Sequence, residues 1–177
     1  VLKLWQGLGY YSRARNLHFS AKHITKNLNG VFPKNFKGLL QLKGVGDYTA
    51  SAISSICYEE SVAVVDGNVY RVLARYFGID TPINTTEGVK KFKTLATSLL
   101  PASNLGDYNQ SIMEFGSRQC KPQSPVCSEC PLNIGCRAYA TGSIKSLPVK
   151  LKKTKVTKKY FNFIVNISED NKTQIEQ

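Results

Sequence analysis

The chain has 177 residues, of which 42% are hydrophobic, and this length can bury one core together with a smaller satellite region. No apolar run approaches the roughly eighteen residues of a membrane span, so the composition excludes a membrane-spanning protein. Lys and Arg number 24 against 12 Asp and Glu, a net charge of +12. This excess favours a polyanion as partner, although an ordinary basic surface has the same composition.

Neither end of the sequence has the form of a natural terminus. Val1 is no start residue, residues 1–5 read as the middle of a helix, and residues 174–177 stop inside a patterned segment. We therefore expect a fragment of a longer protein, truncated at both ends.

Most of the chain has the apolar spacing of amphipathic helices separated by glycine-containing turns. Residues 7–9 (Gly-Leu-Gly) interrupt the first helical pattern, so residues 10 and 11 lie at a bend. Apolar residues over 14–28 recur every three or four positions and predict a helix closed by Gly30. Further helices are predicted over residues 36–42, 47–58, 66–77, 86–100 and 104–116. Residues 62–65 form a short apolar run that is compatible with a strand.

The pattern changes in the last part of the chain. Six of the ten residues 150–159 are lysine, which is typical of a solvated linker. Apolar and polar residues then alternate over 160–167 and meet a turn pattern at 169–172, which predicts a strand leading into a second one. We divide the chain into a helical domain over 1–117, a cysteine-rich segment over 118–145, a basic linker over 146–158 and the start of a β-containing domain over 159–177.

Four cysteines, Cys120, Cys127, Cys130 and Cys136, lie close together with the spacing C-x6-C-x2-C-x5-C. Thiols this dense in a sequence without a secretory signature favour a metal site over disulfides or free thiols. A structural zinc site usually has two C-x2-C pairs and this segment has one, so zinc is the second choice. Loops of unequal length suit a 4Fe–4S cluster, in which each iron takes one cysteine. Cys57, in an apolar stretch upstream, is predicted to be a buried free thiol.

Residues 42–50 (Leu-Lys-Gly-Val-Gly-Asp-Tyr-Thr-Ala) have the form of a hairpin between two helices. Its two glycines allow positive φ and a close approach of the backbone to a partner. The amides of the hairpin and of the next helix's first turn would then point outward together and bind a phosphate without reading sequence. The candidate contacts are Lys43, Gly44, Val45 and Gly46. The plainer interpretation is an ordinary glycine-rich connection.

Three motifs together resemble the helix–hairpin–helix base-excision DNA glycosylases: the hairpin, residues 64–72 (Val-Val-Asp-Gly-Asn-Val-Tyr-Arg-Val) and the four-cysteine spacing. Within that family, residues 4–17 are similar to the A/G-specific adenine DNA glycosylase (MutY) subfamily. The resemblance runs from Leu4 to about Pro148 in unbroken order. It implies a mainly α, helix–hairpin–helix DNA glycosylase fold with a 4Fe–4S cluster loop, and a Nudix-like C-terminal domain that begins after Lys158.

The resemblance implies base-excision repair, in which adenine mispaired with 8-oxoguanine or guanine is flipped out of the duplex and its N-glycosidic bond is hydrolysed. The oxocarbenium-like sugar of that reaction needs a nearby carboxylate. By resemblance, Asp66 is this catalytic carboxylate and Asn68 orients it. The residues alone favour a helix N-cap at Asp66. The two roles are compatible, because a cap is rigidly placed and backbone amides stabilise its charge.

Tyr48 bears on the type of reaction. Related endonuclease III-type glycosylase/lyases carry a lysine at this point, and its amine forms a Schiff base that leads to strand cleavage. A tyrosine cannot form this imine, so the resemblance implies a monofunctional glycosylase in which the ring face of Tyr48 stabilises the cationic sugar. The alternative for Tyr48 is packing in the helical core. Lys43 lies a few residues early and is expected to contact phosphate at most.

Tyr10 is the candidate wedge for base flipping. An aromatic side chain inserted into the duplex offsets the stacking that the extruded base loses, and the resemblance assigns this place to the first tyrosine of Gly-Tyr-Tyr. The alternative is that both tyrosines belong to the core, and we assign that role to Tyr11. Arg13 and Arg15 are candidate phosphate contacts, unless one of them is only a solvated helix charge.

Two features depart from the family's pattern. The family's general acid, a glutamate on a helix before Leu4, has no counterpart, and Glu59, Glu60 and Glu114 stand in different contexts. We therefore expect these 177 residues alone not to remove adenine. The loop between the first two cysteines of the segment carries one positive charge where relatives often have more, so a weaker contact with DNA is expected.

Two other functions stay open: an endonuclease III-like pyrimidine or thymine glycosylase, and a noncatalytic iron–sulfur DNA-binding module in which Asp66 is only a cap. The expected partner is double-stranded DNA with an adenine mispair. We expect no membrane association and a monomer in a bacterial cytoplasm, at the nucleoid. The cluster is expected to order its loop as a structural element, because hydrolysis of a glycosidic bond needs no electron.

Overall fold

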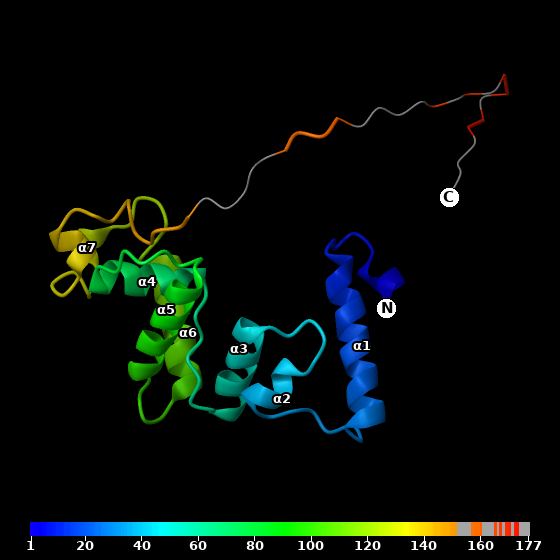
Figure 1. Cartoon of the computed structure of the whole chain (residues 1–177), viewed down its shortest axis with the longest axis horizontal. Helices are drawn as coiled ribbons and strands as arrows, with labels where there is room; N and C mark the ends of the chain where they lie inside the picture. The colour runs from blue at the N-terminus through cyan, green and yellow to red at the C-terminus, as the bar shows by residue number, and fades with distance from the viewer. Residues whose placement is uncertain (152–156, 161–164, 166, 168, 171, 174–177) are drawn as a thin grey trace.

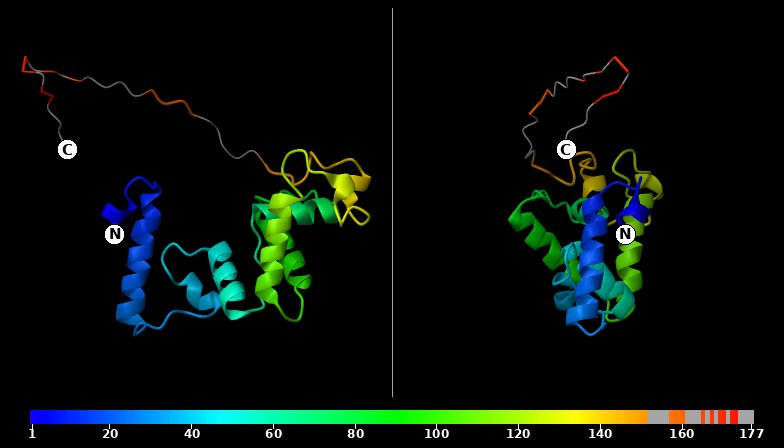
Figure 2. Two further views of the ribbon diagram at one scale, coloured as in Figure 1. Left: turned by 180° about the vertical axis from the view of Figure 1, so that it is seen from behind. Right: turned by 90° about the vertical axis from the view of Figure 1, so that its right-hand side faces the viewer.

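The computed structural model describes residues 1–151, 157–160, 165, 167, 169–170 and 172–173, and its regular elements are helices (Figure 1). In chain order they are η1 (Leu2–Trp5), α1 (Tyr11–Asn27), α2 (Phe36–Leu40), α3 (Asp47–Tyr58), α4 (Gly67–Phe77), α5 (Thr86–Ser98), α6 (Leu105–Arg118), η2 (Cys127–Glu129) and α7 (Arg137–Ala140), where η denotes a short 3₁₀ helix. Figures 1 and 2 show α1 at one end, α2 and α3 in the middle, and α4, α5 and α6 grouped at the other end with α7 beyond them. The predicted mainly α fold is confirmed. None of the helices in the described ranges combines the length and apolar character needed to cross a membrane.

Local capping explains where the helices begin and end. Asn35 accepts a hydrogen bond from the Gly38 amide at 2.8 Å and starts α2, and Thr85 accepts one from the Gly88 amide at 3.0 Å and starts α5. Gly78 ends α4 with a φ of +65°, which glycine adopts without steric cost. The predicted bounds of α3 and α4 agree with the structure.

Two buried clusters hold the helices together. The larger cluster joins α4, α5 and α7 through Ala63, Val69, Leu73, Ala74, Phe92, Ala96, Ala138 and Leu147. The smaller one joins α2, the following turn and α3 through Leu39, Leu42 and Ala50, with Ile24 of α1 packed against it. A core and a satellite are therefore present, as the chain length predicted.

Helix α6 packs closely against α3 and α4 because glycines face both helices. A Cβ at Gly116 would lie 2.7 Å from Asn68 Cβ of α4, and a Cβ at Gly106 would lie 2.9 Å from Ile56 Cα of α3. A side chain at either position would push the helices apart. This packing brings α6 next to the start of α4, where Asp66 lies.

The type of backbone structure differs from the predictions in two places, and several helix ends shift by one to three residues. Residues 2–5 form the 3₁₀ helix η1 rather than the middle of an α-helix. Residues 62–65 pair with no strand in the described part of the chain. A side chain of α6 takes the place of that strand: Asn109 Oδ1 accepts from the Val64 amide at 2.9 Å, and its Nδ2 donates to the Val62 carbonyl at 3.0 Å.

Two burial predictions are wrong as well. Cys57 is exposed, because the buried face of α3 consists of small residues such as Ser54 and Ser55 and Cys57 lies at its edge. Tyr11 is 42% exposed rather than in the core. It is the first residue of α1, and in that turn of the helix Ala14 is the residue that faces inward.

The β-containing C-terminal part lies mostly outside the described residues. Residues 161–164 and 166 of the predicted strand and residues 152–156 of the linker are among those that the structure does not describe. An isolated antiparallel pairing joins Ile167 and Thr173, which flank the predicted turn.

Candidate active site and nucleic-acid interface

Asp66 is the N-cap of α4 and is half-buried, as the residues alone predicted. Its Oδ1 accepts hydrogen bonds from the backbone amides of Asn68 at 2.9 Å and Val69 at 2.8 Å. Its Oδ2 accepts one from Asn68 Nδ2 at 2.8 Å. Both oxygens are therefore held, and Asn68 contacts Asp66 in the way expected of an orienting side chain.

Arg71, which the sequence analysis did not single out, holds Asn68 from the other side. Its Nη2 donates to Asn68 Oδ1 at 2.8 Å and to the Gly116 carbonyl, and its Nε donates to the Cys120 carbonyl at 2.6 Å. Burial is the main cause that lowers the pKa of Arg71, which is 7% exposed. Hydrogen bonds thus run without a break from the Asp66 carboxylate to the cysteine-rich segment. The sequence signal that could have identified Arg71 was its place on the buried face of α4, one turn after Asn68.

All four cysteines of the segment line one cavity, together with Arg75. Burial and the nearby negative charges of Cys120, Cys136 and Cys130 raise the pKa of the Cys127 thiol. Within the described ranges, no three His, Cys, Asp or Glu side chains gather closely enough to hold a single metal ion. Four thiols around a shared space are the donor set of a cluster in which each iron takes one thiolate, so these residues fit a 4Fe–4S cluster.

The hairpin between α2 and α3 lies against α1. Ser20 Oγ of α1 donates to the Lys43 carbonyl at 3.0 Å. Gly44 has a φ of +85°, and a Cβ there would lie 2.7 Å from Asn16 Cβ, so the position requires glycine. Gly46 has a φ of −98°, so only one of the two glycines uses the positive φ that the sequence allowed for both.

The other two hairpin candidates differ in what they expose. Val45 packs against the smaller core cluster, and its amide donates to the Leu42 carbonyl at 3.1 Å, so this amide is already bonded within the hairpin. Lys43 is exposed, and its Nζ lies 4.6 Å from the ring centroid of Phe19 on α1. Gly46 and the first turn of α3 supply the outward amides that a phosphate would meet.

Tyr48 lies in the first turn of α3 and is 48% exposed, so the alternative of core packing is wrong. Its hydroxyl contacts Met113 Sδ of α6 at 4.0 Å. Met113 is one turn before Gly116, which packs on Asn68. Tyr48 and Asn68, which holds Asp66, therefore contact neighbouring positions along α6.

Residues 1–96 match the family of HhH-GPD superfamily base excision DNA repair proteins. The chain belongs to this family. The match covers η1, the hairpin and the Asp66 cap, whereas α6 and the cysteine-rich segment lie beyond it.

Two curated relatives and one solved structure extend the match. The chain is 38% identical over 171 residues to the adenine DNA glycosylase of Buchnera aphidicola subsp. Acyrthosiphon pisum (strain APS), covering 97% of this chain and 49% of the relative. It is 43% identical over 161 residues to the adenine DNA glycosylase of Arabidopsis thaliana, covering 88% and 25%. The chain therefore spans half or less of these relatives. A thermostable thymine-DNA glycosylase superposes with a TM-score of 0.67 at 33% identity, covering 73% of this chain and 59% of that one.

In this HhH-GPD protein the candidate wedge and phosphate contacts lie at the start of α1. Tyr10 is 85% exposed and has a φ of 45°. Trp5 Nε1 donates to the Gly9 carbonyl at 2.9 Å and fixes the turn before it. Arg13 and Arg15 are both exposed. In Figure 1 the turn before α1, the hairpin before α3 and the start of α4 all lie above the loop that connects α1 to α2.

The three glutamates set aside as general acids have structural contacts. Glu59 accepts from the Leu105 amide at 2.7 Å in the first turn of α6, and Glu60 accepts from the Phe36 amide at 2.6 Å in the first turn of α2. Glu114 pairs with Arg118 at 2.9 Å on the surface of α6.

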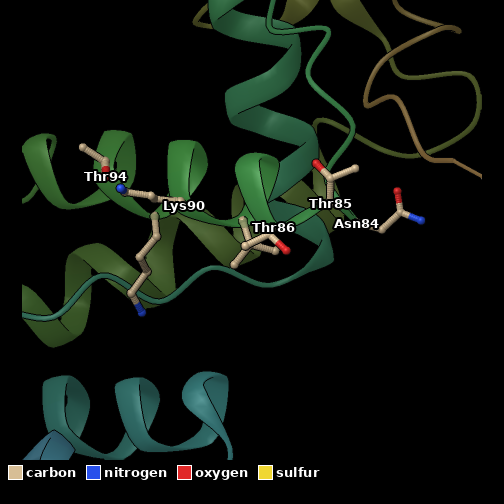
Figure 3. Close-up of a pocket in the computed structure, with 7 residues that line it drawn as sticks. Asn84, Thr85, Thr86, Lys90 and Thr94 are labelled. Carbon is tan, nitrogen blue, oxygen red and sulfur yellow. The ribbon is translucent and has the colours of Figure 1, made fainter.

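A separate cavity of about 550 Å³ lies along α5 and the segment before it (Figure 3). Its lining comprises Asn84, Thr85, Thr86, Val89, Lys90, Lys93 and Thr94. Asp66, Tyr48 and the cysteines of the segment are not part of this lining. We assign the cavity itself no part in the candidate site.

Proposed function

We propose that the protein containing this chain is a monofunctional DNA glycosylase that hydrolyses the N-glycosidic bond of adenine mispaired with 8-oxoguanine or guanine. The observation that carries the proposal is the Asp66 carboxylate, which three hydrogen bonds hold in place, while its partner Asn68 and the exposed Tyr48 contact successive turns of α6. The two relatives named adenine DNA glycosylase support the choice of base.

The chemistry follows from the charge at the sugar. As the C–N bond breaks, the base leaves with its bonding electrons and gains a proton, and C1′ becomes cationic. Water then adds to C1′ and loses a proton, so the products are the abasic sugar and neutral adenine. The Asp66 carboxylate stabilises this positive charge, and its fixed position lowers the cost of reorganisation. Asn68 keeps the carboxylate oriented.

Tyr48 determines that the reaction stops at an abasic site. Its phenol has no amine to attack C1′, so no Schiff base forms and the strand is not cleaved. Its exposed ring offers a π face to the cationic sugar.

DNA binding is proposed to use one surface of the protein. The amides of Gly44 and Gly46 and the positive end of α3 bind backbone phosphate, with Arg13 and Arg15 as further contacts. Tyr10, exposed at the end of a fixed turn, fills the space that the extruded base leaves.

We propose a 4Fe–4S cluster on Cys120, Cys127, Cys130 and Cys136, which would cross-link the segment and leave the reaction to other residues. The domain bounds predicted above, with 159–177 as the start of a Nudix-like domain, are part of the same proposal. So are a monomeric state and a location at the nucleoid of a bacterial cytoplasm.

An Asp66→Asn substitution in the complete protein tests the proposal. Asparagine is as good an N-cap as aspartate, so α4 should stay intact and the melting temperature should change little. The single-turnover rate on a duplex with adenine opposite 8-oxoguanine should fall at least about a hundredfold. A variant that keeps the parent rate would remove Asp66 from the catalytic role.

The same assay separates adenine from thymine as the substrate. The structural similarity to a thymine-DNA glycosylase supports thymine as the second candidate. A parent protein that excises thymine from a T:G duplex and leaves adenine untouched would establish that alternative.

A further inference from the structure

Asp47 is an unfavourable residue at its position for a phosphate-binding hairpin. It is the first residue of α3, in the turn whose amides and positive helix end would receive a DNA phosphate. Its side chain is 64% exposed, so its negative charge stands beside the expected site of another negative charge. Repulsion between the two would weaken binding unless another residue neutralises the carboxylate.

Lys93 of α5 is placed to do this. Its Nζ donates to Asp47 Oδ1 at 2.8 Å and forms an ion pair with it. The same ammonium donates to Ser51 Oγ at 2.9 Å and to the Ala63 carbonyl at 2.9 Å. Its three hydrogen bonds are thus all directed to protein atoms, and the charge is held in one position against α3.

Burial shows that this contact is more than a mobile surface pair. The Lys93 side chain is 29% exposed, whereas Ser51 and Ala63 are almost fully buried. The aromatic ring of Phe36 lies 5.5 Å from Nζ. Because Ala63 lies three residues before Asp66, Lys93 also joins the hairpin helix to the segment that leads into the catalytic cap.

We propose that Lys93 is a positioning residue for DNA binding: it neutralises Asp47 and holds that carboxylate away from the phosphate site at the start of α3. This inference rests on the proposed binding of DNA by the hairpin. It requires no contact between Lys93 and DNA, and it assigns Asp47 a net unfavourable effect on affinity that Lys93 cancels.

A double-mutant cycle tests the proposal, with the affinity of the complete protein for an undamaged duplex as the measurement. Lys93→Met should weaken binding about two- to fivefold at low salt, because one helix-end charge becomes uncompensated. Asp47→Asn should bind as tightly as the parent or more tightly. The double variant should recover the affinity that Lys93→Met lost, and the deficit of Lys93→Met should shrink at high salt.

Other outcomes have distinct meanings. If the double variant binds as weakly as Lys93→Met, Lys93 acts through packing alone and the proposal is overturned. Lys93→Arg retains the charge, so its affinity for the duplex should stay near the parent value even if Lys93→Met lowers the melting temperature. A Lys93→Arg protein that binds the duplex as weakly as Lys93→Met counts against the proposal too. A parent protein that binds no duplex would overturn the proposed function, whereas parental binding by every variant would overturn this inference alone.

Discussion

Asp66 has a structural task as the N-cap of α4 and, in the proposed function, a chemical one. One carboxylate oxygen caps the helix through two backbone amides, and the other is held by Asn68. Asn68 is held in turn by Arg71, whose buried charge is accommodated because its N–H groups meet fixed acceptors. The orientation of Asp66 therefore depends on a residue that does not touch it.

Asn68→Ala should expose this dependence. The substitution leaves both backbone bonds to Asp66 intact but removes the partner of Oδ2 and one of the two partners of Arg71 Nη2. We expect the excision rate to fall about ten- to a hundredfold with little change in DNA affinity. The unfolding free energy should fall by about 1–3 kcal/mol. Single-turnover kinetics, duplex titration and urea unfolding measure the three quantities, and Asn27→Ala, at the exposed last residue of α1, is the control.

Helix α6 sets the spacing between the other elements. It contacts α3 through Gly106 and α4 through Gly116, and Asn109 between them bonds to the backbone of residues 62–64. Small residues at the two crossings let the helix axes approach, and the amide replaces a missing strand partner. As a result, Tyr48 on one helix and Asn68 on another contact successive turns of α6.

Gly116→Ala should disturb this arrangement from a position outside the site. The added Cβ would lie 2.7 Å from Asn68 Cβ and 2.9 Å from the Asn68 carbonyl oxygen. Overpacking of this kind costs about 1–3 kcal/mol of unfolding free energy, and displacement of Asn68 should slow excision as well. Gly67→Ala on the facing helix is the control for stability, because the structure leaves open space at that Cβ. Equal melting temperatures for the two variants would contradict the packing argument.

The cysteine-rich segment completes the larger core and does so through α4. Arg75, 2% exposed, donates to the Lys121 carbonyl at 2.7 Å and to the Ile144 and Leu147 carbonyls at 3.1 Å each. Its Nη1 also lies 3.5 Å from Cys120 Sγ. One arginine thus ties the beginning and the end of the segment to the helix that Asp66 caps.

Cys130→Ser should show what the proposed cluster contributes. Loss of one thiolate should remove iron and the cluster's visible absorption, lower the melting temperature and weaken DNA binding. The excision rate of DNA that is already bound should change less than these quantities. Iron analysis, thermal melting and duplex titration follow these steps. Cys57→Ser, at an exposed thiol away from the segment, should leave all three unchanged. Retention of iron by Cys130→Ser would contradict the proposed ligand set.

Local signals sufficed for much of the fold and part of the site. The Asp66 cap, the end of α4 at Gly78 and the positive φ of Gly44 follow from residues within a few positions of one another. Each depends on steric or hydrogen-bonding preferences that act over one turn of backbone, so these features can be predicted from the sequence. The exposure of side chains was harder to predict, since Tyr11 and Cys57 are apolar enough for a core but lie at helix positions that stay exposed in the described part of the chain.

The sequence by itself determined the helical fold class, the bounds of α3 and α4, the family and the identity of the cysteine and carboxylate candidates, because these depend on spacing along the chain. Only the tertiary structure decided that Arg71 meets Gly116 across 45 residues and that Lys93 meets Asp47 across 46. Such pairs obey no period and have no local partner, so they form only once glycines and buried clusters have set the distances between helices.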